Sequence, residues 1–218
     1  MTTNIHFGAA EAAAQITRFN YHWGSTLGQP AGEITFGFRA TAPTYTSIQN
    51  AQATFTQVTN AEMASARIAL NLWASLASIT FKEVNFNGYT DSASILFGNF
   101  SNNDYTNFAY SPTSNNQSFS SSQGDIWLNI GRFKSMISPT VGSDVFKRVV
   151  HEIGHAIGLS HPGDYNTSPG VSITYSNDAV YIEDSLQYSI MSYFDASETG
   201  ANHVYNNQKN YAANSNAA

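Results

Sequence analysis

One short stretch constrains the fold of this chain more than any other feature: the run HEIGHAIGLSH, from His151 to His161. His151 and His155 are four residues apart, so on a helix both imidazoles project from one face and can share a metal ion. If the helix continued to His161, its side chain would turn about 240° away and lie about 9 Å further along the axis. The spacing therefore predicts a helix that ends abruptly after His155.

Gly158 lies where that helix has to end. Glycine adopts the left-handed conformation at a helix C-terminus without steric cost, so the chain can reverse there and bring His161 back. Three neutral imidazoles around zinc leave a fourth position for water, which is the arrangement of catalytic rather than structural sites. The pattern predicts one catalytic zinc ion held by His151, His155 and His161.

Glu152 directly follows the first predicted ligand, and on a helix its side chain is expected to point beside the metal rather than at it. A carboxylate there can take the proton of a zinc-activated water and act as the general base. The alternative interpretation is a helix whose histidines are ordinary surface or core residues. A lone pair of histidines at this spacing is weak support for zinc, but Glu152, Gly158 and His161 in register favour the metal site.

Downstream, the segment SIMSY at residues 189–193 resembles the methionine turn of the metzincin peptidases. In that family the methionine, here Met191, packs beneath the metal and is not a ligand. Pro162, directly after the third histidine, and Tyr193, two residues after the methionine, resemble the serralysins, which are secreted bacterial zinc proteases. The resemblance implies that Tyr193 is a further metal ligand in the resting enzyme and hydrogen-bonds the developing oxyanion when substrate arrives.

The resemblance to the serralysin catalytic domain extends over residues 15–195. It implies an α+β metzincin fold, in which a five-stranded twisted mixed sheet and two main helices are followed by a small coil-rich C-terminal subdomain. The implied boundaries are an N-terminal subdomain at about 1–158, a C-terminal subdomain at about 159–195 and a polar tail at 196–218. We expect these parts to form a single catalytic domain.

Hydrophobic periodicity indicates the individual elements. Thr59 and Glu62 form a capping-box pair that opens a helix through Leu76, and Asp144 is the expected cap of the active-site helix, which runs to about Ile157. A further short helix is expected at 8–18, strands at 34–38, 79–84, 94–100 and 125–130, and an irregular stretch at 101–124.

The strand at 94–100 has two readings. The resemblance implies that it is an antiparallel edge strand, which offers unpaired backbone groups to an extended peptide substrate. The alternative is an ordinary strand of the sheet. We expect protein or peptide substrates bound in this way.

Composition excludes several other classes of function. The chain has no cysteine, so it has neither disulfides nor thiolate metal ligands. Its net charge is −6 and no Lys/Arg cluster occurs, which argues against a nucleic-acid partner. No apolar stretch approaches the ~18–20 residues that span a membrane. We expect a monomer.

Our expectations about export and calcium binding rest on the resemblance to serralysins. The N-terminus lacks a basic region followed by an apolar run, so we expect no conventional signal peptide. Serralysins use a C-terminal export signal, and the resemblance therefore still implies a secreted, extracellular protein. No Gly-Gly-x-Gly-x-Asp calcium repeat is present, so calcium dependence stays open. We expect either a fragment or reduced form, or a site that is supported in another way.

Two alternatives to this function also stay open. The first is a zinc-binding or interaction protein that uses a degenerate protease fold without hydrolysis. The second is a peptidase of another metzincin subfamily, or one with narrow processing specificity.

Overall fold

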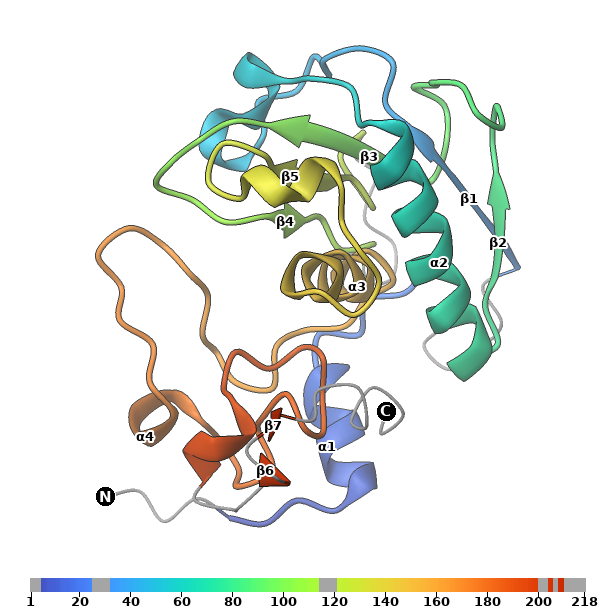
Figure 1. Cartoon of the computed structure of the whole chain (residues 1–218). Helices are drawn as coiled ribbons and strands as arrows, with labels where there is room; N and C mark the ends of the chain where they lie inside the picture. The colour runs from blue at the N-terminus through green and yellow to red at the C-terminus, as the bar shows by residue number, and fades with distance from the viewer. Residues whose placement is uncertain (1–4, 25–31, 114–120, 200–203, 206–207, 210–218) are drawn as a thin grey trace. The chain divides into compact units, whose positions relative to one another are not determined.

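A computed structural model of the chain describes residues 5–24, 32–113, 121–199, 204–205 and 208–209 (Figure 1). The chain divides into two compact units: a large unit at Phe19–Gly158, and a small unit that joins Met1–Arg18 with Leu159–Ala218. The small unit thus groups residues 1–18 with the C-terminal part of the chain. The expected subdomain bounds within a single catalytic domain stay a prediction.

The large unit is built on a five-stranded mixed sheet in the order β2-β1-β3-β5-β4. The first four strands in that order run parallel to their neighbours, and β4 is antiparallel to β5. This arrangement confirms the α+β fold and the mixed sheet. The strands are β1 (Glu33–Phe38), β2 (Thr80–Glu83), β3 (Ile95–Phe100), β4 (Phe108–Ala109) and β5 (Ile126–Asn129).

The expected edge strand is in fact a central one. All six residues of β3 are buried, and β3 pairs in parallel with β1 on one side and β5 on the other. Its nearly continuous apolar sequence, ILFGNF, is typical of a parallel strand that is covered on both faces. The antiparallel edge strand is β4, which lies in the stretch predicted to be irregular; residues 114–120 of that stretch lie outside the described residues.

Helix α2 (Asn60–Leu76) confirms the predicted capping box. The Thr59 hydroxyl accepts the backbone N–H of Glu62 at 3.2 Å, and the Thr59 N–H donates to the Glu62 carboxylate at 2.6 Å. Met63, Leu70 and Trp73 are buried along one stripe of this helix. The Trp73 indole N–H donates to the carbonyl of Val150 at 3.0 Å and so joins α2 to the active-site helix.

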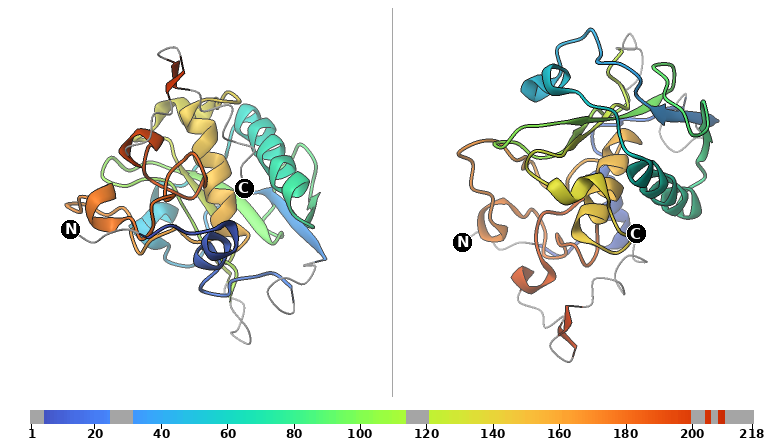
Figure 2. Two further views of the ribbon diagram at one scale, coloured as in Figure 1. Left: turned by 90° about the horizontal axis from the view of Figure 1, so that it is seen from below. Right: turned by 45° about the horizontal axis from the view of Figure 1, so that its top comes forward.

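The active-site helix is α3 (Asp144–Ala156), and its cap is Ser143 rather than the expected Asp144. Ser143 has extended backbone angles, and its hydroxyl accepts the N–H of Phe146 at 3.2 Å. Asp144 is the first helical residue, where it pairs with Arg148 at 3.0 Å. Helices α2 and α3 contact each other and lie on the same side of the sheet (Figures 1 and 2).

The small unit contains little regular structure, as expected for a coil-rich subdomain. Its elements are α1 (Ala9–Ile16), α4 (Tyr175–Asp178), a 3-10 turn at Ala196–Thr199 and a short antiparallel pair, β6 (Val204–Tyr205) with β7 (Gln208–Lys209). Tyr165, Ala179 and Phe194 form a small buried cluster. The rest of the predicted polar tail at 196–218 lies outside the described residues. Within the described parts of the chain, no helix is both long and apolar enough to cross a membrane.

Candidate zinc site

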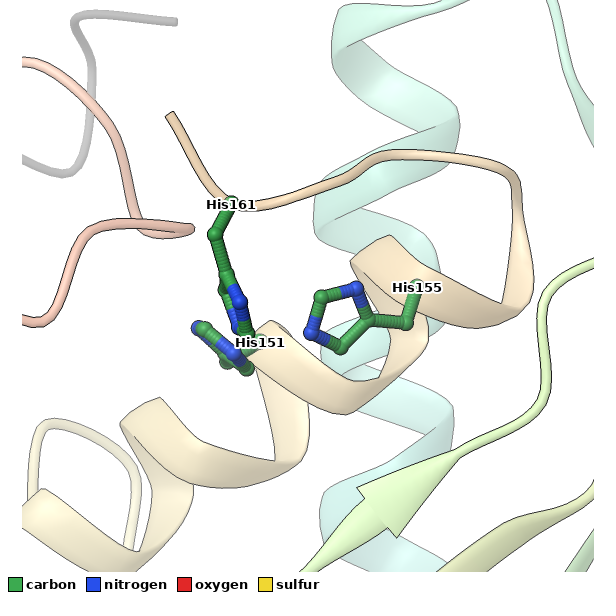
Figure 3. A group of neighbouring side chains, drawn as sticks. All are labelled: His151, His155 and His161. Carbon is green, nitrogen blue, oxygen red and sulfur yellow. The ribbon is translucent and has the colours of Figure 1, made fainter. Parts of the chain in front are cut away.

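The three predicted ligands come together. His151 and His155 project from α3, and His161 reaches toward them from the segment that follows the helix (Figure 3). Each offers one ring nitrogen, and these atoms all lie within 4.8 Å of one another. Zinc–nitrogen bonds are about 2.0–2.1 Å long, so small rotations of the rings bring all three nitrogens to one ion. The donor set therefore fits zinc.

The helix ends where the sequence predicted. The last helical hydrogen bonds run from Ile157 N–H to the Ile153 carbonyl at 2.9 Å and from Gly158 N–H to the His155 carbonyl at 3.0 Å. Gly158 has a φ of +115°, and a Cβ atom there would lie 2.3 Å from the carbonyl oxygen of Tyr21. Glycine is thus required at this position both for the reversal and for the close approach of another backbone.

The segment that carries His161 is anchored to the end of α1, which the sequence did not indicate. The Arg18 guanidinium donates to the carbonyl oxygens of His161 at 2.6 Å and Gly163 at 3.1 Å. It also pairs with Asp164 at 2.7 Å. The N–H of Ser160 donates to the carbonyl of Ile16 at 2.7 Å. These bonds hold the backbone on both sides of the third ligand.

The imidazole of His161 is oriented by Tyr165. Its Nδ1 lies 2.8 Å from the carbonyl oxygen of Tyr165, and the two rings stack with centroids 5.4 Å apart. A carbonyl oxygen only accepts hydrogen bonds, so this contact assigns the proton to Nδ1 and leaves the Nε2 lone pair for a metal. His161 itself is buried, with 7% of its surface exposed.

Glu152 lies on α3 and is also buried, with 6% of its surface exposed. Burial raises the pKa of its carboxyl to about 8, and the positive charge of Arg148 opposes this shift. A bound dication would lower that pKa, because it stabilises the carboxylate. The carboxyl is therefore suited to exchange a proton near neutral pH.

The methionine turn is formed as the sequence indicated. Met191 has no exposed surface, and its N–H donates to the Ser189 hydroxyl at 3.2 Å. Tyr193 lies against the third ligand, with its ring centroid 4.4 Å from that of His161. Its hydroxyl is 3.4 Å from the side-chain oxygen of Asn166.

Comparison with known proteins identifies the family. The sequence profile of peptidase family M10, described as matrixin, matches residues 37–179. The chain belongs to the matrixin (M10) family of peptidases. This membership agrees with the histidine motif and with the metzincin fold, and zinc is the catalytic metal that it implies.

Three relatives refine the place of the chain within this family. Serralysin B of Dickeya chrysanthemi is 34% identical over 193 residues, which cover 85% of this chain and 37% of the relative. Metalloprotease AprA of Pseudomonas entomophila is 38% identical over 162 residues, or 73% of this chain and 32% of the relative. The serralysin of Proteus mirabilis is 33% identical over 199 residues, or 87% of this chain and 40% of the relative.

These relatives confirm the serralysin-type resemblance that Pro162 and Tyr193 indicated. The chain spans between 32% and 40% of the length of the curated relatives it matches.

Proposed function

We propose that this chain is the catalytic part of a zinc-dependent endopeptidase that hydrolyses peptide bonds in proteins. The observation that carries the proposal is the group of three histidine nitrogens within 4.8 Å of one another, with Glu152 buried on the same helix. Zinc held by His151, His155 and His161 would supply Lewis-acid chemistry, which activates water and polarises a carbonyl. The remaining steps fall to side chains of the chain.

Glu152 is the proposed general base. Its carboxylate takes a proton from the attacking water and then delivers it to the leaving amine. Its buried position supports this role, because burial raises the pKa of the carboxyl to about 8 in the metal-free chain and so makes the carboxylate a stronger base. An exposed glutamate with an ordinary pKa would be a weaker base toward the attacking water.

Tyr193 is the proposed partner of the oxyanion and, in the resting enzyme, a further metal ligand. A phenol hydroxyl donates a hydrogen bond, and a donor aimed at developing negative charge stabilises the transition state. The place of its ring against His161 supports this role, because it keeps the side chain beside the third ligand.

The proposed substrate is a protein or peptide bound in extended form along β4. Among the described residues, this strand pairs with β5 on one side and ends the sheet on the other, so it has an edge at which a further strand can be added. It also contacts α3, the helix that carries His151 and His155. Strand β4 thus replaces the stretch 94–100 in the substrate role that we expected from the sequence.

An assay of casein or a quenched fluorescent peptide tests the function. We expect hydrolysis that a chelator abolishes and added zinc restores, with one zinc ion per chain. One bound zinc ion without any hydrolysis would instead indicate the non-hydrolytic zinc-binding protein.

The proposal includes an extracellular monomer, on the strength of the resemblance to secreted serralysins. Light scattering of the purified chain and fractionation of the producing culture test these two points. A dimer in solution, or activity confined to cells, would contradict them.

A further inference from the structure

Asp184 is a carboxylate with no exposed surface, seven residues before Met191. Its oxygens accept hydrogen bonds from the hydroxyls of Tyr165 at 2.8 Å and Ser192 at 2.7 Å. Within the described part of the chain, no Lys, Arg or His forms an ion pair with it. Desolvating a carboxylate without a cation costs folding free energy, so packing alone does not account for its presence.

Hydrogen bonds to Tyr165 connect Asp184 with His161, the third predicted zinc ligand. The Tyr165 hydroxyl lies 2.8 and 3.1 Å from the two carboxylate oxygens, which fixes the position of the ring. The carbonyl of the same residue accepts the hydrogen bond from His161 Nδ1 at 2.8 Å, and its ring stacks on the imidazole. Asp184 therefore holds the residue that orients His161.

Through Ser192, Asp184 reaches the methionine turn. The Ser192 hydroxyl donates to the carboxylate and accepts the N–H of Phe194 at 3.1 Å. The N–H of Leu186 donates to the carbonyl of Phe194 at 2.8 Å and closes the loop that carries Met191 and Tyr193. One carboxylate thus links the segment of the third ligand to the turn that follows it, although Tyr165 and Ser192 are 27 positions apart.

We propose that Asp184 is a positioning residue that fixes His161 and Tyr193 in a common orientation for zinc. It acts through Tyr165 and Ser192. The inference rests on the proposed function, in which His161 holds the metal. A network that only stabilised the fold would lower stability when broken, but it would not change zinc affinity beyond that effect. Measuring both quantities separates the two roles.

The chain offers a matched pair of variants for this test. Tyr45 also donates its hydroxyl to a buried aspartate, Asp125, but that aspartate is bonded to Arg39 and to no proposed ligand. Tyr165→Phe and Tyr45→Phe each remove one buried tyrosine–aspartate hydrogen bond. The readouts are unfolding of the zinc-free chain by urea, the zinc dissociation constant from competition with a chelator, and the absorption spectrum of the cobalt-substituted chain.

We expect both variants to lower stability, and only Tyr165→Phe to weaken zinc binding, by about 10–100-fold, as loss of a partner of a metal ligand does. Its cobalt spectrum should also change. Asp184→Asn, which keeps the side-chain volume but loses one acceptor oxygen, should shift zinc affinity and spectrum in the same direction. It keeps the inference testable if Tyr165→Phe does not fold.

Wild-type zinc affinity and cobalt spectrum in folded Tyr165→Phe or Asp184→Asn would overturn the inference. An equal loss of zinc affinity in Tyr45→Phe would do the same, because it would trace the effect to general stability. None of these readouts requires peptide hydrolysis. A wild-type chain that binds zinc without hydrolysing peptides contradicts only the proposed function.

Discussion

Replacing Gly158 with alanine adds a methyl group where the chain has neither the conformation nor the room for one. The added Cβ would lie 2.3 Å from the carbonyl oxygen of Tyr21 and 2.9 Å from its carbonyl carbon, at a φ of +115°. Backbone strain of this kind costs about 1–3 kcal/mol, and overpacking costs about 1–3 kcal/mol more. The reduced entropy of the unfolded chain offsets about 0.4–1 kcal/mol of this. We therefore expect a net destabilisation of about 1–6 kcal/mol.

Two other glycines serve as controls that distinguish the cost of backbone strain from the cost of the steric contact. Gly142 and Gly170 have φ values of +85° and +81°, and a Cβ at either would meet no heavy atom within 4 Å. Alanine at these positions is strained but not crowded, so we expect a cost of at most about 3 kcal/mol. Urea unfolding of the three zinc-free variants, followed by circular dichroism, gives the comparison. If Gly158→Ala costs no more than either control, the argument from the Tyr21 contact is refuted.

The Gly158→Ala variant should also bind zinc more weakly than the wild-type chain. The reversal at Gly158 directs the chain toward His161, and a shifted backbone would carry that ligand away from the other two. We expect the zinc dissociation constant, measured against a competing chelator, to rise in Gly158→Ala and to stay unchanged in Gly142→Ala and Gly170→Ala. An unchanged constant in Gly158→Ala would show that the segment after the helix can reach the metal by another path.

Three further predictions concern single carboxyl and hydroxyl groups. Glu152→Gln should keep one zinc ion per chain and lower kcat by about 10²–10⁴-fold, the usual contribution of a general base; near-normal turnover would contradict that role. Tyr193→Phe should keep zinc and lower kcat by about 10²–10³-fold, as loss of an oxyanion donor does, and an unchanged rate would remove its catalytic role. Burial raises the pKa of Asp184 from 3.8 to about 6, against the opposing hydrogen bonds from Ser192 and Tyr165. The unfolded chain releases this proton first as pH rises from about 4 to 6, so the carboxyl destabilises the zinc-free fold by up to about 3 kcal/mol across that window. Urea unfolding at several pH values should therefore give a flatter profile for Asp184→Asn than for wild type; equal slopes would contradict the pKa shift.

The features that the sequence predicted well are those set by local spacing. The positions of His151, His155 and Glu152 follow from the geometry of one helix, and the stop at Gly158 follows from the conformational freedom of glycine. The capping box of Thr59 is likewise a relation between residues three positions apart. Such patterns hold wherever the segment lies in the fold, so the sequence alone is sufficient to find them.

The features that the sequence missed depend on contacts between distant segments. The order of strands in a sheet is one of these, and it explains why the central β3 was assigned to the edge while the two-residue β4 was overlooked. The apolar run of β3 was a usable signal of a strand covered on both faces. The carboxylate of Asp184 gave no such signal, because nothing beside it in sequence distinguishes a buried acid from a surface one. The cap was misplaced by one residue, because both Ser143 and Asp144 are common capping residues.

The hydrogen bond between Arg18 and His161 has a consequence for the order in which parts of the chain fold. These two residues are 143 positions apart, and the bond between them holds the backbone of the third ligand. Contacts so distant in sequence form late, because closing a long loop costs entropy before any contact is gained. The helix with its two histidines can form from local interactions long before this. A newly made chain would therefore acquire the predicted metal site, and with it the proposed peptidase activity, only after its early and late segments have met.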